Sequence, residues 1–124
     1  MGFMENKFRL LSETERLIAY TNRILPNLPK KEIVLKDNIE KNQYELIENI
    51  FASNINYKTP RIREKNLKDV IIKLSMFDFY ARQMYYKKYI SQHQLDCMTR
   101  LFHEIRKTAY GLINSIKENK DAVQ

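Results

Sequence analysis

Apolar residues along the chain recur at intervals of three and four positions, which is the spacing of one face of an α-helix. Three breaks interrupt this pattern, at residues 26–29, 53–60 and 89–91. Proline and small polar residues mark the first two breaks, and a weaker Tyr-Ile-Ser signal marks the third. The pattern therefore predicts an all-α protein of four helices. Long helices with short connections pack most simply as an antiparallel up-down-up-down four-helix bundle.

Capping and proline signals place the ends of the first two helices. Ser12 and Glu15 form a capping-box pattern, in which each side chain satisfies a free N–H group of the first turn. We therefore expect the first helix to begin at Ser12, which leaves residues 1–11 as an N-terminal extension. Pro26 should end this helix because its ring clashes with the preceding turn. The second helix is expected over Lys30–Ser53.

The third helix carries more apolar residues than a single core-facing stripe needs. It is predicted to begin at Pro60, with Thr59 as its N-cap. One stripe with a helical period is formed by Leu67, Val70, Ile71, Leu74, Phe77, Ala81, Met84 and Tyr85. A second set of apolar positions is formed by Ile72, Met76, Phe79 and Tyr80. This helix is therefore expected to be apolar on more than one side.

The fourth helix opens with a second capping-box pattern, formed by Ser91 and Gln94. Gly111 lies inside its apolar stripe, where a glycine costs about 1 kcal/mol relative to alanine. Either another backbone approaches closely at Gly111, or the glycine is a tolerated defect. The polar residues 119–124 are expected to fray, so the bundle should span residues 12–118.

Composition agrees with a single globular domain, because the chain has 124 residues, of which 44% are apolar and 30% charged. With only 2 Gly and 3 Pro, it lacks the turn residues of a β-sandwich. The single cysteine excludes an intrachain disulfide and a cysteine-rich zinc module. No apolar segment is long enough for a signal peptide or a membrane span. We therefore expect a cytoplasmic protein with no membrane partner.

The net charge of +7 is concentrated in one part of the chain. Nine basic and three acidic residues lie between Tyr57 and Tyr89, which places +6 of that charge there. Around the start of the third helix the basic residues are Lys58, Arg61, Arg63, Lys65 and Lys68. Positive charge at a helix N-terminus is unfavourable for the helix dipole. This cluster therefore points to an anionic partner, whose phosphate contacts would weaken as salt rises.

A second basic cluster is expected at the opposite end of the bundle. There Lys87 and Lys88 end the third helix, and the first connection brings in Arg23, Lys30, Lys31 and Lys36. Cations also favour a helix C-terminus, which is an ordinary explanation for Lys87 and Lys88. The nearby tyrosines Tyr80, Tyr85, Tyr86 and Tyr89 suit stacking on exposed bases. Tyrosines at this spacing are more often core or interface edges.

The sequence contains no constellation of residues that indicates catalysis. His93 and Cys97 lie four positions apart on one helix, but they provide two ligands where zinc needs three or four. Cys97 and His103 lie on nearly opposite sides of the helix, so they do not form a nucleophile pair. Asp78 is either a buried partner for an arginine, such as Arg82 one turn on, or simply faces solvent. We expect a non-enzyme with no cofactor and no metal.

Several stretches resemble the four-helix-bundle family that includes Avd, the accessory variability determinant of diversity-generating retroelements, and proteins encoded in 23S rRNA intervening sequences. Residues 15–20 and 24–30 are similar to the family's first helix and its Pro-Lys turn. Residues 89–94 are similar to its Tyr-Ile-Ser start of the last helix. Near the C-terminus, the chain resembles the family's closing pattern at Glu104, Ile105, Lys107 and Gly111.

The resemblance extends over residues 12–117, with two departures. Arg106 stands where the closing pattern prefers Gly, and Leu112 stands where it prefers Trp. The resemblance implies a homopentameric barrel of four-helix protomers with a basic surface. It also implies association with a reverse transcriptase and its template RNA, or an RNA/DNA hybrid, in support of mutagenic cDNA synthesis. A third helix with two apolar sides suits such a ring.

We keep three hypotheses from different classes. The leading one is a non-catalytic reverse-transcriptase accessory protein that binds RNA through the basic clusters. The second is a structural oligomer, or a bundle of the 23S rRNA intervening-sequence type, with no reverse transcriptase as partner. The third is a metalloenzyme that uses His93 and Cys97, and it requires stoichiometric metal in the purified protein.

Overall fold

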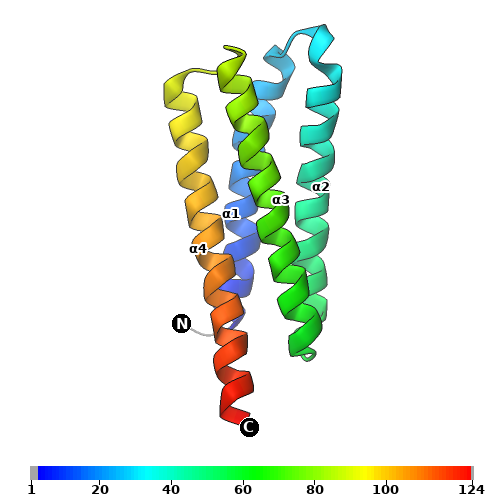
Figure 1. Ribbon diagram of the computed structural model, residues 1–124, viewed down its shortest axis with the longest axis vertical. Helices are drawn as coiled ribbons and strands as arrows, with labels where there is room; N and C mark the ends of the chain where they lie inside the picture. Colours follow the sequence, from blue (N-terminus) through cyan, green and yellow to red (C-terminus); the bar gives the residue numbers. More distant parts are fainter. Residues whose placement is uncertain (1–2, 124) are drawn as a thin grey trace.

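The computed structural model of the protein describes the backbone of residues 3–123 and the side chains of residues 8–118. Within this range there are four long helices and no strand. The helices are α1 (Phe3–Ile24), α2 (Ile33–Ile55), α3 (Pro60–Tyr86) and α4 (Gln92–Val123). Helices that follow one another in the chain run in opposite directions (Figure 1). The predicted antiparallel four-helix bundle is therefore confirmed.

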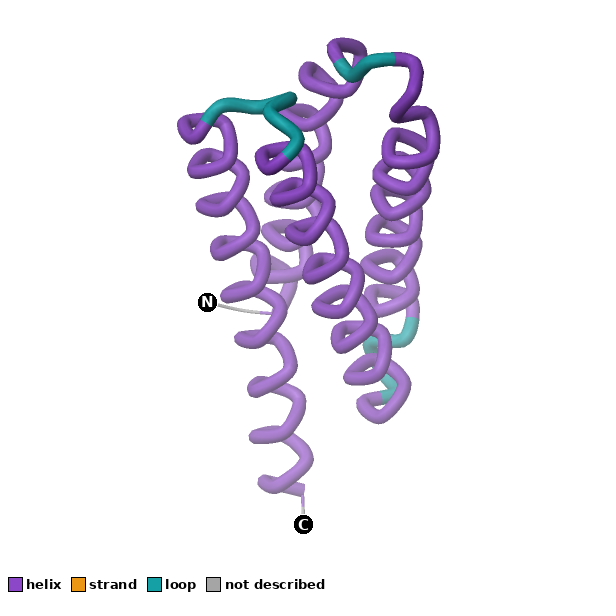
Figure 2. Tube along the Cα trace, turned by 45° about the horizontal axis from the view of Figure 1, so that its top comes forward, coloured by secondary structure: helices purple, strands orange, loops and turns teal. Residues whose placement is uncertain are grey.

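Short connections join the helices at the two ends of the bundle (Figure 2). Two 3₁₀ turns, η1 (Leu25–Asn27) and η2 (Lys30–Glu32), link α1 to α2. Pro26 lies in η1, so the first helix ends where the proline predicted. The second helix was expected from Lys30, but residues 30–32 form η2, in which the N–H of Glu32 bonds to the carbonyl of Pro29 at 2.9 Å.

The predicted start of α3 is confirmed at Pro60, although its cap differs. Thr59 makes no side-chain cap hydrogen bond, and only its carbonyl accepts from the N–H of Arg63, at 2.9 Å. The capping box of α4 is confirmed in full. The N–H of Ser91 donates to Gln94 Oε1 at 2.8 Å, and the N–H of Gln94 donates to Ser91 Oγ at 3.1 Å.

The first helix begins at Phe3, so the prediction of a start at Ser12 is wrong. Ser12 and Glu15 lie inside α1 with exposed side chains. Leu10 lies seven positions before Leu17, and both are fully buried in the same stripe. Burying a leucine contributes about 1.5–3 kcal/mol, which outweighs a cap worth about 1 kcal/mol. Residues 119–124 are the segment expected to fray. Their side chains lie outside the described residues, and the backbone of α4 continues as a helix to Val123.

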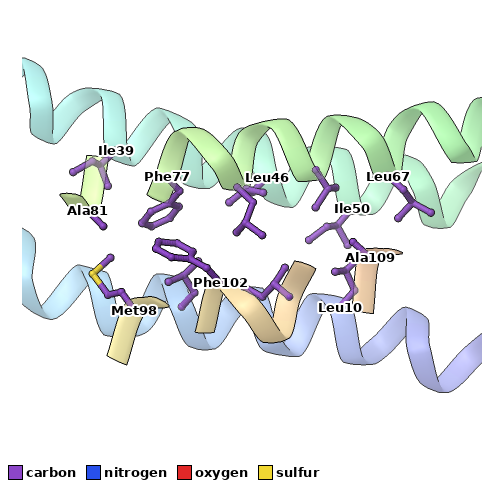
Figure 3. Packing of buried hydrophobic residues seen from close by; sticks show 14 of the residues in the cluster. Leu10, Ile39, Leu46, Ile50, Leu67, Phe77, Ala81, Met98, Phe102 and Ala109 are labelled. Carbon is purple, nitrogen blue, oxygen red and sulfur yellow. The ribbon is translucent and has the colours of Figure 1, made fainter. Parts of the chain in front are cut away.

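The core receives apolar side chains from all four helices (Figure 3). Phe77 of α3 and Phe102 of α4 meet at its centre, with ring centroids 5.5 Å apart and planes inclined at 61°. The core stripe of α3 alternates steps of four and three residues through Leu67, Val70, Leu74, Phe77, Ala81 and Met84. This interval keeps one seam of a helix against its neighbours in a bundle with shallow crossing angles.

The arrangement of the helices gives the bundle two opposite sides. Helix α1 packs against α2 and α4, and α3 packs against the same two helices. The side formed by α1 and α4 therefore lies opposite the side formed by α2 and α3 (Figures 1 and 2).

Candidate functional site

The basic cluster predicted at the start of α3 is only partly a surface feature. Arg63 is 8% exposed, so its prediction as a surface contact for nucleic acid is wrong. It lies four positions before Leu67 and therefore occupies the core-facing stripe of α3. Burial lowers the pKa of its guanidinium, because a low-dielectric environment disfavours the charged form.

Two further members of the predicted cluster are paired along the helix surface. Lys65 Nζ lies 3.7 Å from Asp69 Oδ2, and Lys68 Nζ lies 3.9 Å from Glu64 Oε1. Both are (i, i+4) pairs on a solvated face, which contribute little stability but offset the local charge. Lys58 lies over the Tyr57 ring, 5.5 Å from its centroid, and Arg61 is exposed. The cluster therefore offers fewer uncompensated cations than its sequence indicates.

The opposite end of the bundle brings the first and third connections together, as expected. Lys87 Nζ lies 3.0 Å from Glu32 Oε2. The Tyr89 hydroxyl and the Lys87 ammonium hold the pKa of Glu32 below its ordinary value, because both interactions favour the carboxylate. Lys30 and Lys31 are exposed in η2, and Lys88 is exposed just after α3 with a left-handed φ of 68°.

The tyrosines near these lysines are mostly edges of the core. Tyr80, Tyr85 and Tyr89 are partly buried against the apolar cluster, whereas Tyr86 is 68% exposed. The ordinary interpretation of these side chains is therefore correct for three of the four. Base stacking by Tyr86 stays a prediction.

A groove that the sequence analysis missed lies between α1 and α4. One cavity of about 570 Å³ is lined by Arg9, Ser12, Glu13, Arg16, Glu104, Lys107, Thr108 and Gly111. A second cavity of about 400 Å³ is lined by Arg16, Ala19, Tyr20, Arg23, Cys97, Arg100, Leu101 and Glu104. Arg16 and Glu104 line both cavities, so the two are adjacent along the α1–α4 side, and together we call them the groove.

Cations outnumber carboxylates in this groove. Arg23, Arg100 and Lys107 form no ion pair with any residue that the structure describes, and all three are exposed. Arg16 Nη1 lies 3.8 Å from Glu104 Oε2, where both side chains are more than half exposed. Such a pair is weak and exchanges readily with solvent or another anion.

The floor of the groove contains a buried carboxyl. Glu13 is 6% exposed, and its Oε1 accepts from Thr108 Oγ1 at 2.8 Å and lies 3.3 Å from Arg9 Nε. Burial raises the pKa of Glu13, while the hydrogen bond from Thr108 and the charge of Arg9 act in the opposite direction. A Cβ added at Gly111 meets no atom within 4 Å, so of the two explanations for this glycine, close approach of another backbone of this chain is excluded.

Part of this groove could have been found in the sequence. Arg9, Arg16 and Arg23 are spaced by seven residues, as are Arg100 and Lys107. Seven residues make two helical turns, so each set lines one side of its helix. The spacing does not show which other helix faces that side, and this is why the groove was missed.

Helices α2 and α3 have a different surface chemistry. Their exposed large apolar side chains are Ile33, Val34, Tyr44, Phe51 and Ile55 on α2, and Ile62, Ile72, Met76, Phe79 and Tyr86 on α3. Ile72 is 59% exposed and Phe79 52% exposed, although each lies within two positions of a fully buried residue. The prediction that the third helix is apolar on more than one side is confirmed. We call these ten residues the apolar face.

A family model described as bAvd-like matches residues 7–116, which is most of the chain. The chain belongs to the bAvd-like family. A search of curated proteins finds no match to it.

In this bAvd-like bundle the stretches that carried the resemblance lie at turns and along the groove. Residues 24–30 form the connection between α1 and α2, and residues 89–94 form the turn and cap that open α4. From the closing pattern, Glu104, Lys107 and Gly111 line the groove.

The residues considered for chemistry form no centre in the bAvd-like chain. His93 Nε2 and Cys97 Sγ are 3.6 Å apart, but no group of three potential metal ligands occurs among the described residues. Asp78 pairs with Arg82 at 3.2 Å on the surface, so the expected arginine partner is present but the pair is not buried. No helix in the described part of the chain is long and apolar enough to span a membrane.

Proposed function

We propose that this chain is a non-catalytic accessory protein of a diversity-generating retroelement. It binds the reverse transcriptase and its template RNA, and it supports mutagenic cDNA synthesis while the polymerase chemistry belongs to the partner. The observation that carries this proposal is the match of the bAvd-like family model over residues 7–116. The net charge of +7 supports it, because a basic protein is suited to a polyanionic partner.

The apolar face supports assembly of this protein with itself. Monomeric proteins rarely expose so many large apolar side chains on one side, and such patches mark interaction surfaces. Ten exposed apolar side chains from two adjacent helices make a surface that a neighbouring protomer covers. The resemblance to Avd proteins makes a homopentameric barrel the form that we propose.

The alternative is a structural oligomer with no reverse transcriptase as partner, or a bundle of the 23S rRNA intervening-sequence type. One observation favours it, namely that Lys65 and Lys68 of the predicted basic cluster are paired with carboxylates. The two functions differ in their behaviour toward RNA and polymerase.

Light scattering of the purified protein, alone and with a structured template RNA, tests this function. We expect a particle of several 15.0-kDa chains that binds the RNA at low salt and releases it at high salt. Co-purification with a reverse transcriptase is expected as well. An oligomer that ignores both RNA and polymerase would favour the structural alternative. A monomer indifferent to both would overturn the proposal.

A further inference from the structure

We propose that the groove between α1 and α4 binds the sugar–phosphate backbone of a single-stranded nucleic acid. This inference rests on the proposed function for the class of partner, and it adds the strand type and the surface. The cations that would contact the backbone are Arg9, Arg16, Arg23, Arg100 and Lys107.

The cations of the groove are evenly spaced along both of its rims. Arg9, Arg16 and Arg23 follow one another along α1 at steps of about 10.5 Å, for a row of about 21 Å. Arg100 and Lys107 repeat the same step on α4. A constant interval between cations matches a partner whose negative charges also repeat at a constant interval, which is the property of a phosphate backbone.

The chemistry of these cations favours phosphate. Four of the five are arginines, and half of the chain's eight arginines line this groove. A guanidinium binds phosphate oxygens through two parallel hydrogen bonds and remains charged at every physiological pH. Four of the groove cations are also available for a ligand, since Arg23, Arg100 and Lys107 have no ion-pair partner among the described residues and the ion pair of Arg16 with Glu104 is long. Arg9 is paired with Glu13 at 3.3 Å.

The shape of the groove favours one strand over two. Axes of packed helices lie about 8–10 Å apart, so a groove between them is too narrow to hold a duplex. The groove is lined in part by small residues that leave space for a ligand, namely Ser12, Ala19 and Gly111. Partly buried apolar surface on which a base can stack is provided by Tyr20 and Leu101. The groove is lined by α1 and α4, whereas the apolar face lies on α2 and α3, so assembly through the apolar face does not use the residues that line the groove.

Binding of a labelled, unstructured RNA of about 16 nucleotides, compared with the matching RNA duplex across a salt series, tests the inference. The groove variant combines Arg16→Gln, Arg23→Gln and Arg100→Gln. The control variant combines Lys41→Gln, Arg82→Gln and Lys117→Gln, three exposed cations outside the groove and outside both predicted basic clusters, so it removes the same charge elsewhere. We expect the groove variant to lose at least about tenfold in affinity and about 2 units in the slope of log K against log salt. The control should stay close to the unmodified protein.

A neutral substitution separates groove shape from charge. Gly111→Leu places a side chain on the groove lining without changing charge, and it replaces glycine by a strong helix former. We expect weaker binding of the single strand together with a higher melting temperature, whereas Gly111→Ala should keep the binding. Loss of binding with a lower melting temperature would count against the groove, because it would indicate structural damage.

The remaining outcomes each overturn a defined part of the inference. If the control variant loses affinity and the groove variant does not, the groove is not the site, while RNA binding and the proposed function stand. If the duplex binds as tightly as the single strand, the strand type is wrong. If a glutamate-rich peptide of equal charge competes as well as RNA, the groove binds acidic protein. If the unmodified protein binds no RNA at any salt, the proposed function fails together with the inference.

Discussion

The two long sides of the bundle are built from the same kind of helix but have opposite surface chemistry. On the α2–α3 side, Ile72 and Phe79 expose large apolar side chains. On the α1–α4 side, Arg16, Arg23 and Arg100 line a polar groove. A four-helix bundle needs only one apolar stripe per helix for its core. Residues outside that stripe are therefore free to serve contacts with partners. Here the exposed apolar residues and the groove cations indicate two different partners.

Neither surface favours an isolated protomer. Exposed apolar side chains promote association, and like charges along a groove repel one another. A neighbouring protomer relieves the first cost, and a polyanion relieves the second. The contrast therefore predicts that substitutions on the apolar face disturb assembly with little effect on nucleic-acid binding. Substitutions in the groove should disturb nucleic-acid binding with little effect on assembly.

The largest effect is expected from charges on the apolar face. Ile72→Glu combined with Phe79→Glu places two carboxylates in the proposed interface, at a cost of several kcal/mol per ion. The assembly should dissociate to particles of 15.0 kDa, which light scattering measures, while circular dichroism still shows a helical protein. The matched control, Asn114→Glu with Ser115→Glu on exposed positions of α4, should remain assembled. Equal dissociation of both variants would remove the distinction between the two sides.

A comparison of Phe77 with Phe79 sharpens the distinction between core and surface on one helix. Phe77→Ala removes a fully buried ring in contact with Phe102 and should cost about 3–5 kcal/mol of unfolding free energy. This loss should be the same at every protein concentration. Phe79→Ala should lower stability only where the protein is assembled, so its effect depends on concentration. Urea denaturation over a range of protein concentrations measures both, and a concentration-independent loss for Phe79→Ala would place it in the protomer core.

The smallest effect concerns Glu13 on the floor of the groove. Burial raises the pKa of Glu13 in the folded protein, so the ionised carboxylate is unfavourable there. This cost is absent below the ordinary glutamate pKa and develops as pH rises through the raised value. Glu13→Gln keeps an acceptor for Thr108 and should be more stable than the unmodified protein at neutral pH, by less than about 1 kcal/mol.

The pH dependence checks the sign of this prediction. The difference in melting temperature between Glu13→Gln and the unmodified protein should shrink toward about pH 4, where the carboxyl is protonated. The same variant should bind single-stranded RNA more tightly, since it removes a negative charge from the groove. A less stable variant at neutral pH would mean that the attraction of Arg9 outweighs the cost of burial.

Much of the fold could be predicted because its signals are local. The Ser91–Gln94 capping box, the start of α3 at Pro60 and the end of α1 before Pro26 each depend on a few adjacent residues, and all three are present. The second apolar stripe of α3 was likewise visible as a periodicity. Residues whose role depends on a single helix are therefore well described by sequence.

The errors share a physical cause, which is competition between a local signal and burial. The capping pattern at Ser12 was overruled because Leu10 extends the core stripe of α1 by a full two turns. Arg63 was assigned to the surface by its charge, although its spacing from Leu67 places it in the core stripe. In both cases the position relative to the stripe decided the outcome, and residue type did not.

The sequence by itself determined the number of helices, their breaks and the stripe that each turns toward the core, because these follow from hydrogen bonding and periodicity within one segment. It also contained the seven-residue spacing of the groove arginines. Only the tertiary structure decided that α1 and α4 face each other across a groove and that α2 and α3, which expose large apolar side chains, pack beside each other. The physical reason is that a helix packs by burying apolar area, and this fixes which of its residues face the core. Residues on the outer surfaces of two helices become neighbours only through the arrangement of all four helices in the bundle.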